Sequence, residues 1–138
     1  MKGFQRFILL ALIVSCIGIG CGSQKEGEPD LFSSFSINRD ENLVVIANRN
    51  KIDDKDEFAR QLVRMCKENS FHSIKFSTDR GYATSLDMRV YLWRGEVEGN
   101  DPVMVVEYKS DDWNQQYDIV RNPEKFKLYV DGELVDNN

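Results

Sequence analysis

The feature that most constrains this chain is an uncharged stretch near its N-terminus. Residues 7–24 contain no Asp, Glu, Lys or Arg, although charged residues make up 30% of the 138 residues. Two basic residues, Lys2 and Arg6, precede the stretch, and every acidic residue follows it. A globular surface needs charged and polar residues, so the folded part is expected beyond the stretch, where the length fits a single domain.

Residues 1–21 have the order of a secretory signal. Lys2 and Arg6 come first, an apolar run follows over residues 7–14, and mostly small residues then lead to Cys21. Here the chain resembles the signal of bacterial lipoproteins, in which a short motif, the lipobox, ends in a small residue and a cysteine. The resemblance covers residues 1–30 only. It implies cleavage before Cys21, lipid on this cysteine and a location on the outer side of a bacterial membrane.

Two alternatives to lipidation at Cys21 stay open. Cys16 follows residues of good lipobox composition, but only residues 7–12 would then remain as the apolar core of the signal. Cys21 has a full-length apolar segment before it and residues typical of a lipoprotein tether after it. The second alternative is an uncleaved transmembrane anchor. A spanning helix needs about 20 predominantly apolar residues, and this segment offers fewer.

The charge of the remaining chain limits its partners. Removal of residues 1–20 takes away two of the 18 basic residues and none of the 23 acidic ones, which changes the net charge from −5 to −7. Such a surface repels nucleic-acid phosphates and does not hold a protein on anionic lipid headgroups. We therefore expect no nucleic-acid partner, and membrane attachment through lipid on Cys21 rather than through surface charge.

The composition divides the chain into three parts. Residues 22–35 are rich in Gly, Ser, Glu and Pro, which predicts a flexible tether. We therefore expect a signal peptide over residues 1–20, a tether over 21–35 and a single domain over 36–138. With Cys21 lipidated, Cys66 has no partner in the mature chain, so the domain is expected to be stabilised by its core without a disulfide.

The hydrophobic pattern of the domain predicts a helix among strands. Residues 43–47 form a short apolar run typical of a buried strand, and residues 58–66 place apolar side chains on one helical face, with Asp53 as the expected N-cap. Further strands are predicted at residues 72–77, 86–93 and 103–108, and a short hairpin is predicted at residues 126–135, with Asp131 and Gly132 as its turn. The pattern indicates an α+β fold, with one main helix packed on a mainly antiparallel sheet of about five strands.

No motif predicts a catalytic site, a metal site or a cofactor. His72 is the only histidine, and zinc requires three or four ligands. Neither a phosphate-binding glycine loop nor a dinucleotide fingerprint is present. The acidic cluster at residues 53–57 is explained by helix capping, and Asp111 and Asp112 by a turn. We therefore favour a protein that is not an enzyme, although a carboxylate pair that meets only in space stays open.

The candidate binding face lies on the strand predicted at residues 86–93. If Leu86, Met88, Val90 and Leu92 face the helix, the aromatic and basic residues between and after them lie on the opposite face. Exposed aromatic side chains beside arginines are typical of binding patches. This face consists of Arg89, Tyr91, Trp93 and Arg94. The alternative is that residues 109–125, with Trp113 and Tyr117, cover these aromatics and form a second small core.

These observations favour a membrane-anchored, extracytoplasmic lipoprotein whose domain is a binding or interaction module. Its partner would be an envelope protein or a cell-wall ligand. A cell-envelope hydrolase whose carboxylates converge only in three dimensions is one alternative. Another is an immunity-type lipoprotein that intercepts a basic toxin at the membrane.

Overall fold

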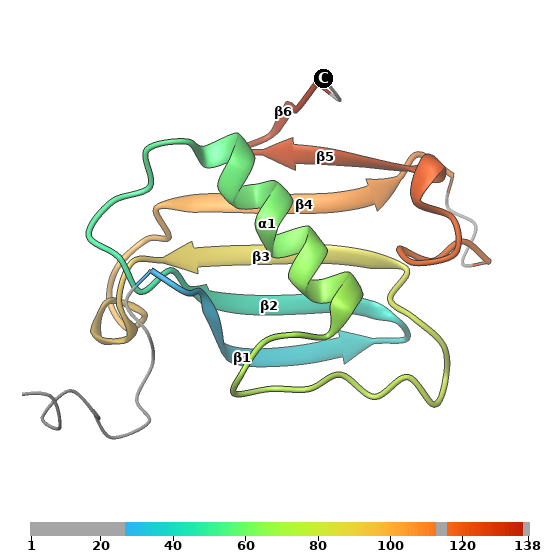
Figure 1. Cartoon of the computed structure of the whole chain (residues 1–138), viewed down its shortest axis with the longest axis horizontal. Coiled ribbons are helices and arrows are strands. Elements are labelled where there is room, and N and C mark those ends of the chain that lie inside the picture. The colour runs from blue at the N-terminus through green and yellow to red at the C-terminus, as the bar shows by residue number, and fades with distance from the viewer. Residues whose placement is uncertain (1–26, 113–115, 137–138) are drawn as a thin grey trace, which may run out of the picture.

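The computed structural model describes residues 27–112 and 116–136, in which one helix packs on one face of a six-stranded sheet (Figure 1). The strands lie side by side in chain order. They are β1 (Asp30–Ile37), β2 (Asp40–Ile46), β3 (Ser85–Tyr91), β4 (Met104–Ser110), β5 (Phe126–Val130) and β6 (Glu133–Leu134). The helix is α1 (Lys55–Glu68), and two short 3-10 turns are η4 (Arg94–Glu96) and η5 (Pro123–Lys125).

The predicted fold class is confirmed at the level of one helix on a mostly antiparallel sheet. Two details differ from the expectation. The sheet has six strands instead of about five, and it is mixed, because β2 and β3 pair in parallel. The parallel pair follows from the connection, since α1 crosses over the sheet between these two strands and returns the chain in the same direction.

The core lies between α1 and the sheet. The helix buries Phe58, Ala59, Leu62, Val63 and Cys66. From β3, the core receives Leu86, Met88 and Val90, with Leu92 packed against its edge, so the predicted alternation is confirmed. Every residue of this core lies between Leu31 and Val135.

Both ends of α1 are capped, the first by a side chain and the second by the backbone of Asn69. Asp54 is the N-cap and accepts a hydrogen bond from the N–H of Glu57 at 3.0 Å. The prediction of Asp53 as N-cap is therefore wrong by one residue, and Asp53 is exposed beside Lys51. At the other end Asn69 adopts a left-handed conformation, with φ of 54°, which asparagine tolerates better than most residues.

The segment at residues 72–77 is not a strand, contrary to the prediction. The side chain of Asn69 pairs with the backbone of Phe76, accepting from its N–H at 2.8 Å and donating to its carbonyl at 3.1 Å. Farther back, the N–H and hydroxyl of Ser73 both donate to the buried carboxylate of Asp30. The backbone groups of Ser73 and Phe76 thus bond to side chains and not to a neighbouring strand. The segment forms a loop, and its Ile74 and Phe76 pack against the core.

The folded domain begins earlier than the sequence predicted. β1 starts at Asp30, and both Asp30 and Leu31 are buried, so residues 27–35 belong to the domain and not to the tether. The N–H of Gly27 donates to the carbonyl of Asn48 at 2.6 Å, and the Asn48 side chain donates to the carbonyl of Glu28. The predicted signal peptide and residues 21–26 lie outside the described residues. Within residues 27–112 and 116–136, no helix has the length and apolar character that crossing a bilayer requires.

A β-bulge in β1 decides which of its side chains face the helix. Leu31 pairs with Val45 and Ser33 with Val44, so Phe32 has no partner on β2. The extra residue reverses the alternation along the rest of the strand. Ser34 and Ser36 consequently face α1, whereas Phe35 and Ile37 lie on the opposite face of the sheet, which we call the outer face.

Candidate functional site

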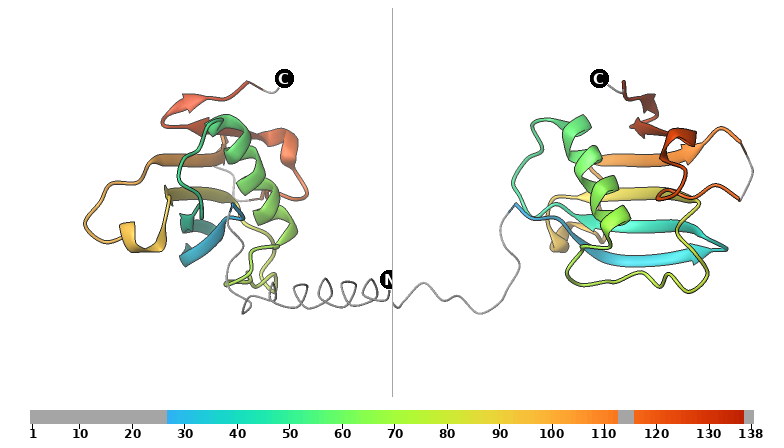
Figure 2. Two further views of the ribbon diagram at one scale, coloured as in Figure 1. Left: turned by 60° about the vertical axis from the view of Figure 1, so that its left-hand side comes forward. Right: turned by 45° about the vertical axis from the view of Figure 1, so that its right-hand side comes forward.

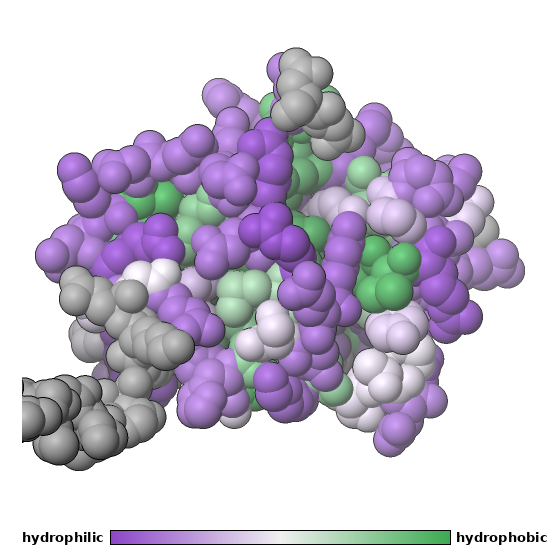
Figure 3. Space-filling view, viewed as in Figure 1, coloured by the Kyte–Doolittle hydropathy of each residue, from purple (hydrophilic) through white to green (hydrophobic). Residues whose placement is uncertain are grey.

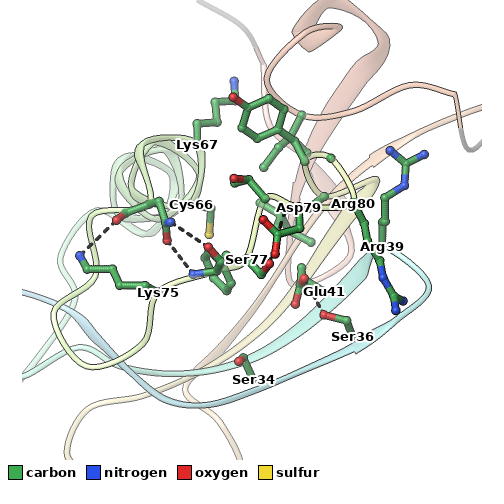
Figure 4. A pocket seen from close by; sticks show the side chains of 18 of the residues that line it. Ser34, Ser36, Arg39, Glu41, Cys66, Lys67, Lys75, Ser77, Asp79 and Arg80 are labelled. Atoms are coloured by element: carbon green, nitrogen blue, oxygen red, sulfur yellow. Dashed lines mark hydrogen bonds between the residues drawn. The ribbon is translucent and has the colours of Figure 1, made fainter.

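A cavity of about 350 Å³ opens on the helix side of the sheet (Figure 4). It lies between the C-terminal end of α1, the β1–β2 hairpin and the loop that precedes β3. Its apolar lining includes Cys66, Leu86 and Ile119. Its polar lining comes from all three segments and includes Ser34, Ser36, Glu41, Asn69, Ser77 and Asp79. This volume falls in the range of small-molecule sites, about 300–1,000 Å³.

The cavity exists because small and polar residues occupy positions that would otherwise complete the core. On the helix side of the hairpin, Leu31, Leu43 and Val45 are buried in the core. Toward the turn, the equivalent inward positions carry Ser34, Ser36 and Glu41. Serine side chains are too small to fill the space under the end of α1, so a hollow with polar walls remains.

Glu41 and Cys66 face this hollow from opposite walls, one from β2 and the other from α1 (Figure 4). The hydroxyl of Ser36 donates to Oε1 of Glu41 at 2.6 Å. Burial, and secondarily the charge of Glu41, raises the pKa of the Cys66 thiol well above its ordinary value. The thiol therefore stays protonated at neutral pH and is a poor nucleophile.

Basic side chains surround the edge of the cavity. Lys75 donates to the carbonyl of Asn69 at 3.1 Å, and Lys67 lies over the ring of Tyr108. Glycine is favoured at position 81, in the loop that precedes β3, because its φ of +102° is a backbone conformation that other residues rarely adopt. The site thus combines hydrogen-bonding walls, an inner carboxylate and a cationic edge, an arrangement suited to holding a polar ligand.

The structure separates the four residues predicted as a binding face. Arg89 is exposed on the outer face, whereas Tyr91 is buried opposite Ile46 of β2. Trp93 and Arg94 are partly or largely exposed, and the guanidinium of Arg94 lies 5.2 Å from the ring centroid of Phe32. The loop that carries η4 projects on the side opposite α1 (Figure 2). Phe32, which the sequence prediction did not include, therefore joins Trp93 and Arg94 at this end of the sheet.

Residues 109–125 do not cover this face in the described part of the chain. Ile119 belongs to the main core, and Tyr117 and Val120 pack against it. Trp113 lies outside the described residues. The alternative prediction was that this loop covers Tyr91 and forms a second core. The described residues of the loop pack against the main core instead.

One cross-strand pair of acidic residues lies outside the cavity, whose own lining includes the carboxylates of Glu41 and Asp79. Asp87 and Glu107 are direct cross-strand neighbours, and partial burial followed by the charge of Glu107 raises the pKa of Asp87. They do not line the cavity but lie on the outer face, beside Arg89 and Lys109, whose charges lower the same pKa. Among the described residues, no group of three or more His, Cys, Asp or Glu side chains could hold a metal ion.

The other residues that the sequence analysis considered for a reaction or for lipid attachment are placed as follows. His72 is exposed in the loop after α1 and does not line the cavity. Asp111 pairs with Lys127 at 2.6 Å. Cys21, the predicted lipid-attachment residue, lies outside the described residues.

Sequence reasoning missed the cavity because its walls come from segments far apart in the chain. One local signal was available. Residues 34–37 alternate serine with Phe35 and Ile37, a pattern typical of a strand with two different faces. Their Ser-rich composition pointed instead to a tether, and the bulge that selects the inward face depends on pairing with β2.

Comparisons with known proteins supply no relative: no protein-family model, no curated protein and no solved structure matches this chain. The function is therefore inferred from the residues and their geometry.

Proposed function

We propose that this protein is an extracytoplasmic lipoprotein, held on a bacterial membrane by lipid on Cys21, and that its domain binds a polar ligand of the cell envelope. The anchor is supported by residues 1–21, with two basic residues, an apolar run, and small residues before the cysteine. The binding role is supported by the cavity under the end of α1.

One observation carries the binding role. Three inward positions of the hairpin hold Ser34, Ser36 and Glu41 where apolar side chains would extend the core. Full burial of a large apolar side chain stabilises a fold by about 1.5–3 kcal/mol. The three polar positions of the hairpin do not contribute this stabilisation. Polar positions that lower stability in this way are typical of binding sites.

The anchor is tested by metabolic labelling with palmitate in a bacterial host. The full chain should take up label, Cys16→Ala should retain it, and Cys21→Ala should lose it. If the wild-type chain takes up no label, the anchor is wrong. Loss of label in Cys16→Ala but not in Cys21→Ala would move the lipid to Cys16.

The cavity is tested with two tryptophan substitutions on one strand. Ser34→Trp fills the cavity, whereas Ser33→Trp places the same side chain on the outer face. Immobilised wild type and Ser33→Trp should retain the same component from purified peptidoglycan digests or detergent-extracted envelope, and Ser34→Trp should not. Thermal unfolding establishes that both variants fold. Equal retention by Ser34→Trp would show that the cavity is not the binding site.

A further inference from the structure

The strand that follows the predicted anchor has its apolar side chains on the solvent side. Phe35 and Ile37 are each 60% exposed on the outer face, and Phe32 at the bulge is 37% exposed. Trp93, 36% exposed, lies at the same end of the sheet as Phe32, because its neighbour Arg94 stacks over the Phe32 ring. We call Phe32, Phe35, Ile37 and Trp93 the apolar strip.

The β1 part of this strip carries no charge. Residues 31–38 contain no Asp, Glu, Lys or Arg, in a chain with 30% charged residues. β1 is also an edge strand, with β2 as its only strand partner in the described part of the chain. The loop after α1 runs along this edge (Figure 1), where Ser73 donates to Asp30, so the exposed apolar surface of β1 is its outer face. Exposed apolar side chains without charges between them indicate a surface that is covered when the protein functions.

The proposed anchor joins the domain beside this strip. Gly27 is hydrogen-bonded to Asn48, whose own N–H donates to the carbonyl of Leu92 at 2.9 Å. Gly27 therefore lies at the end of the sheet where β1 begins and Trp93 follows β3. Six residue steps separate Cys21 from Gly27, and an extended chain spans at most about 3.6 Å per residue, so their Cα atoms are within about 22 Å. The lipid on Cys21 would keep this end of the domain near the bilayer.

We propose that the apolar strip rests on the zwitterionic headgroup region of the membrane that holds Cys21. This inference rests on the proposed anchor. Tryptophan and other aromatic side chains are favoured at membrane interfaces, and Arg94 extends a cation from the same place toward headgroup phosphates. The helix side of the molecule is covered largely by hydrophilic residues (Figure 3). On the outer face, β3 and β4 carry charged side chains such as Asp87 and Glu107, so the proposed lipid contact is limited to the apolar strip.

The charge of the protein indicates which headgroups it can contact, and the length of the tether indicates how strong the contact must be. The mature chain has a net charge of −7, and Glu96, Glu98 and Asp101 follow Trp93 in the chain, so anionic headgroups are disfavoured. The contact itself can be weak, because a short tether makes docking an intramolecular event with a high effective concentration. Docking would place β1 along the bilayer and leave the cavity, which opens on the helix side, accessible to ligand.

The test replaces biological lipidation with a chemical anchor. The chain 21–138 with Trp113→Phe, so that Trp93 is the only tryptophan, is coupled through the Cys21 thiol to a maleimide lipid in phosphatidylcholine vesicles. Brominated phosphatidylcholine should quench the Trp93 fluorescence at least twofold. Combined Phe35→Ser and Ile37→Ser should remove at least half of that quenching. The control Leu134→Ser removes an apolar side chain of 54% exposure from β6, at the far edge of the sheet, and should leave the quenching unchanged.

Each other outcome overturns the proposal. Absence of quenching would show that the strip does not reach lipid, and an equal loss with Leu134→Ser would show that the contact is unspecific. Stronger quenching when half of the lipid is replaced by phosphatidylglycerol would exclude the zwitterionic preference. A dimer of the uncoupled chain in sedimentation, dissolved by the Phe35→Ser and Ile37→Ser pair, would assign the strip to a second copy. Because coupling is chemical, these results are independent of palmitate labelling.

Discussion

At the scale of single residues, asparagine and aspartate allow the chain to make turns that most other residues would strain. Asn38, Asn48, Asn69 and Asp131 all have positive φ, between 50° and 59°. These residues are the non-glycine types most often found in this conformation, since their short side chains bond to nearby backbone. Asp131 also accepts a hydrogen bond from the N–H of Val105 in β4 at 2.9 Å, which joins this turn to the sheet. Such residues position the loops that surround the core.

Cys66 offers a test of burial at the cavity wall. Its pKa is raised first by burial and second by Glu41, so the thiol stays protonated at pH 8, where an ordinary thiol is partly ionised. In a chain with Cys16→Ser and Cys21→Ser, the native protein should react with a disulfide reagent roughly 100-fold more slowly than the protein in urea, because Cys66 is 6% exposed at the cavity wall and its thiol stays protonated. Absorbance of the released thiolate measures both rates.

The substitution Glu41→Gln distinguishes the two causes of the raised pKa of Cys66, which are burial and the charge of Glu41. Because burial is the larger cause, the variant should keep Cys66 nearly as unreactive as in the parent chain. A native-state rate that approaches the rate in urea would show that the charge of Glu41, and not burial, protects the thiol.

At the scale of elements, the helix and the central strands were predictable, and two peripheral segments were not. The 3.6-residue spacing of α1 and the alternation of β3 have their cause in local geometry, so they are visible in the sequence. Residues 72–77 alternate as a strand does, yet Asn69 and Asp30 hold them as a loop. β1 resembled a tether, and its pairing with β2 makes it a strand. Local pattern fails where the partner of a segment lies elsewhere in the chain.

The N-cap of α1 allows the one-residue correction to be tested. Asp54 accepts a hydrogen bond from the N–H of Glu57, whereas Asp53 is exposed and pairs only with the exposed Lys51. Asp54→Ala should lower the free energy of unfolding by about 1 kcal/mol. Asp53→Ala, the control, should change it by less than about 0.5 kcal/mol, since exposed ion pairs contribute little. Urea denaturation compares the two, and a larger effect at Asp53 would restore the original prediction.

At the scale of the whole molecule, the edge strand β1 links the folding of the domain to its proposed attachment. The strand supplies Leu31 to the core, and Asp30 holds the loop after α1 through Ser73. The same strand begins three residues after Gly27, where the described part of the domain starts. A change to residues 27–35 therefore affects both the stability of the domain and the position of its apolar strip.

Truncation distinguishes the observed domain boundary from the predicted one. A chain that begins at Gly27 should unfold in a single cooperative transition, because it contains every core residue of the described part of the chain. A chain that begins at Ser36 lacks Leu31 and most of β1. Loss of a buried leucine alone costs about 2–5 kcal/mol, a large part of the stability of a small domain. We expect the shorter chain to lack a cooperative thermal transition in circular dichroism. Equal transitions in both chains would show that residues 27–35 are a tether after all.

The order of residues along the chain determined what local physics controls: the signal-like N-terminus, the acidic surface, the helix and the central strands with their inward faces. Tertiary structure alone decided the parallel pairing of β2 with β3, the bulge at Phe32 and the cavity behind Ser34 and Ser36. The reason is physical. Periodicity records which face of an element is apolar, but register, bulges and hollows depend on partners that meet only when distant segments pack together.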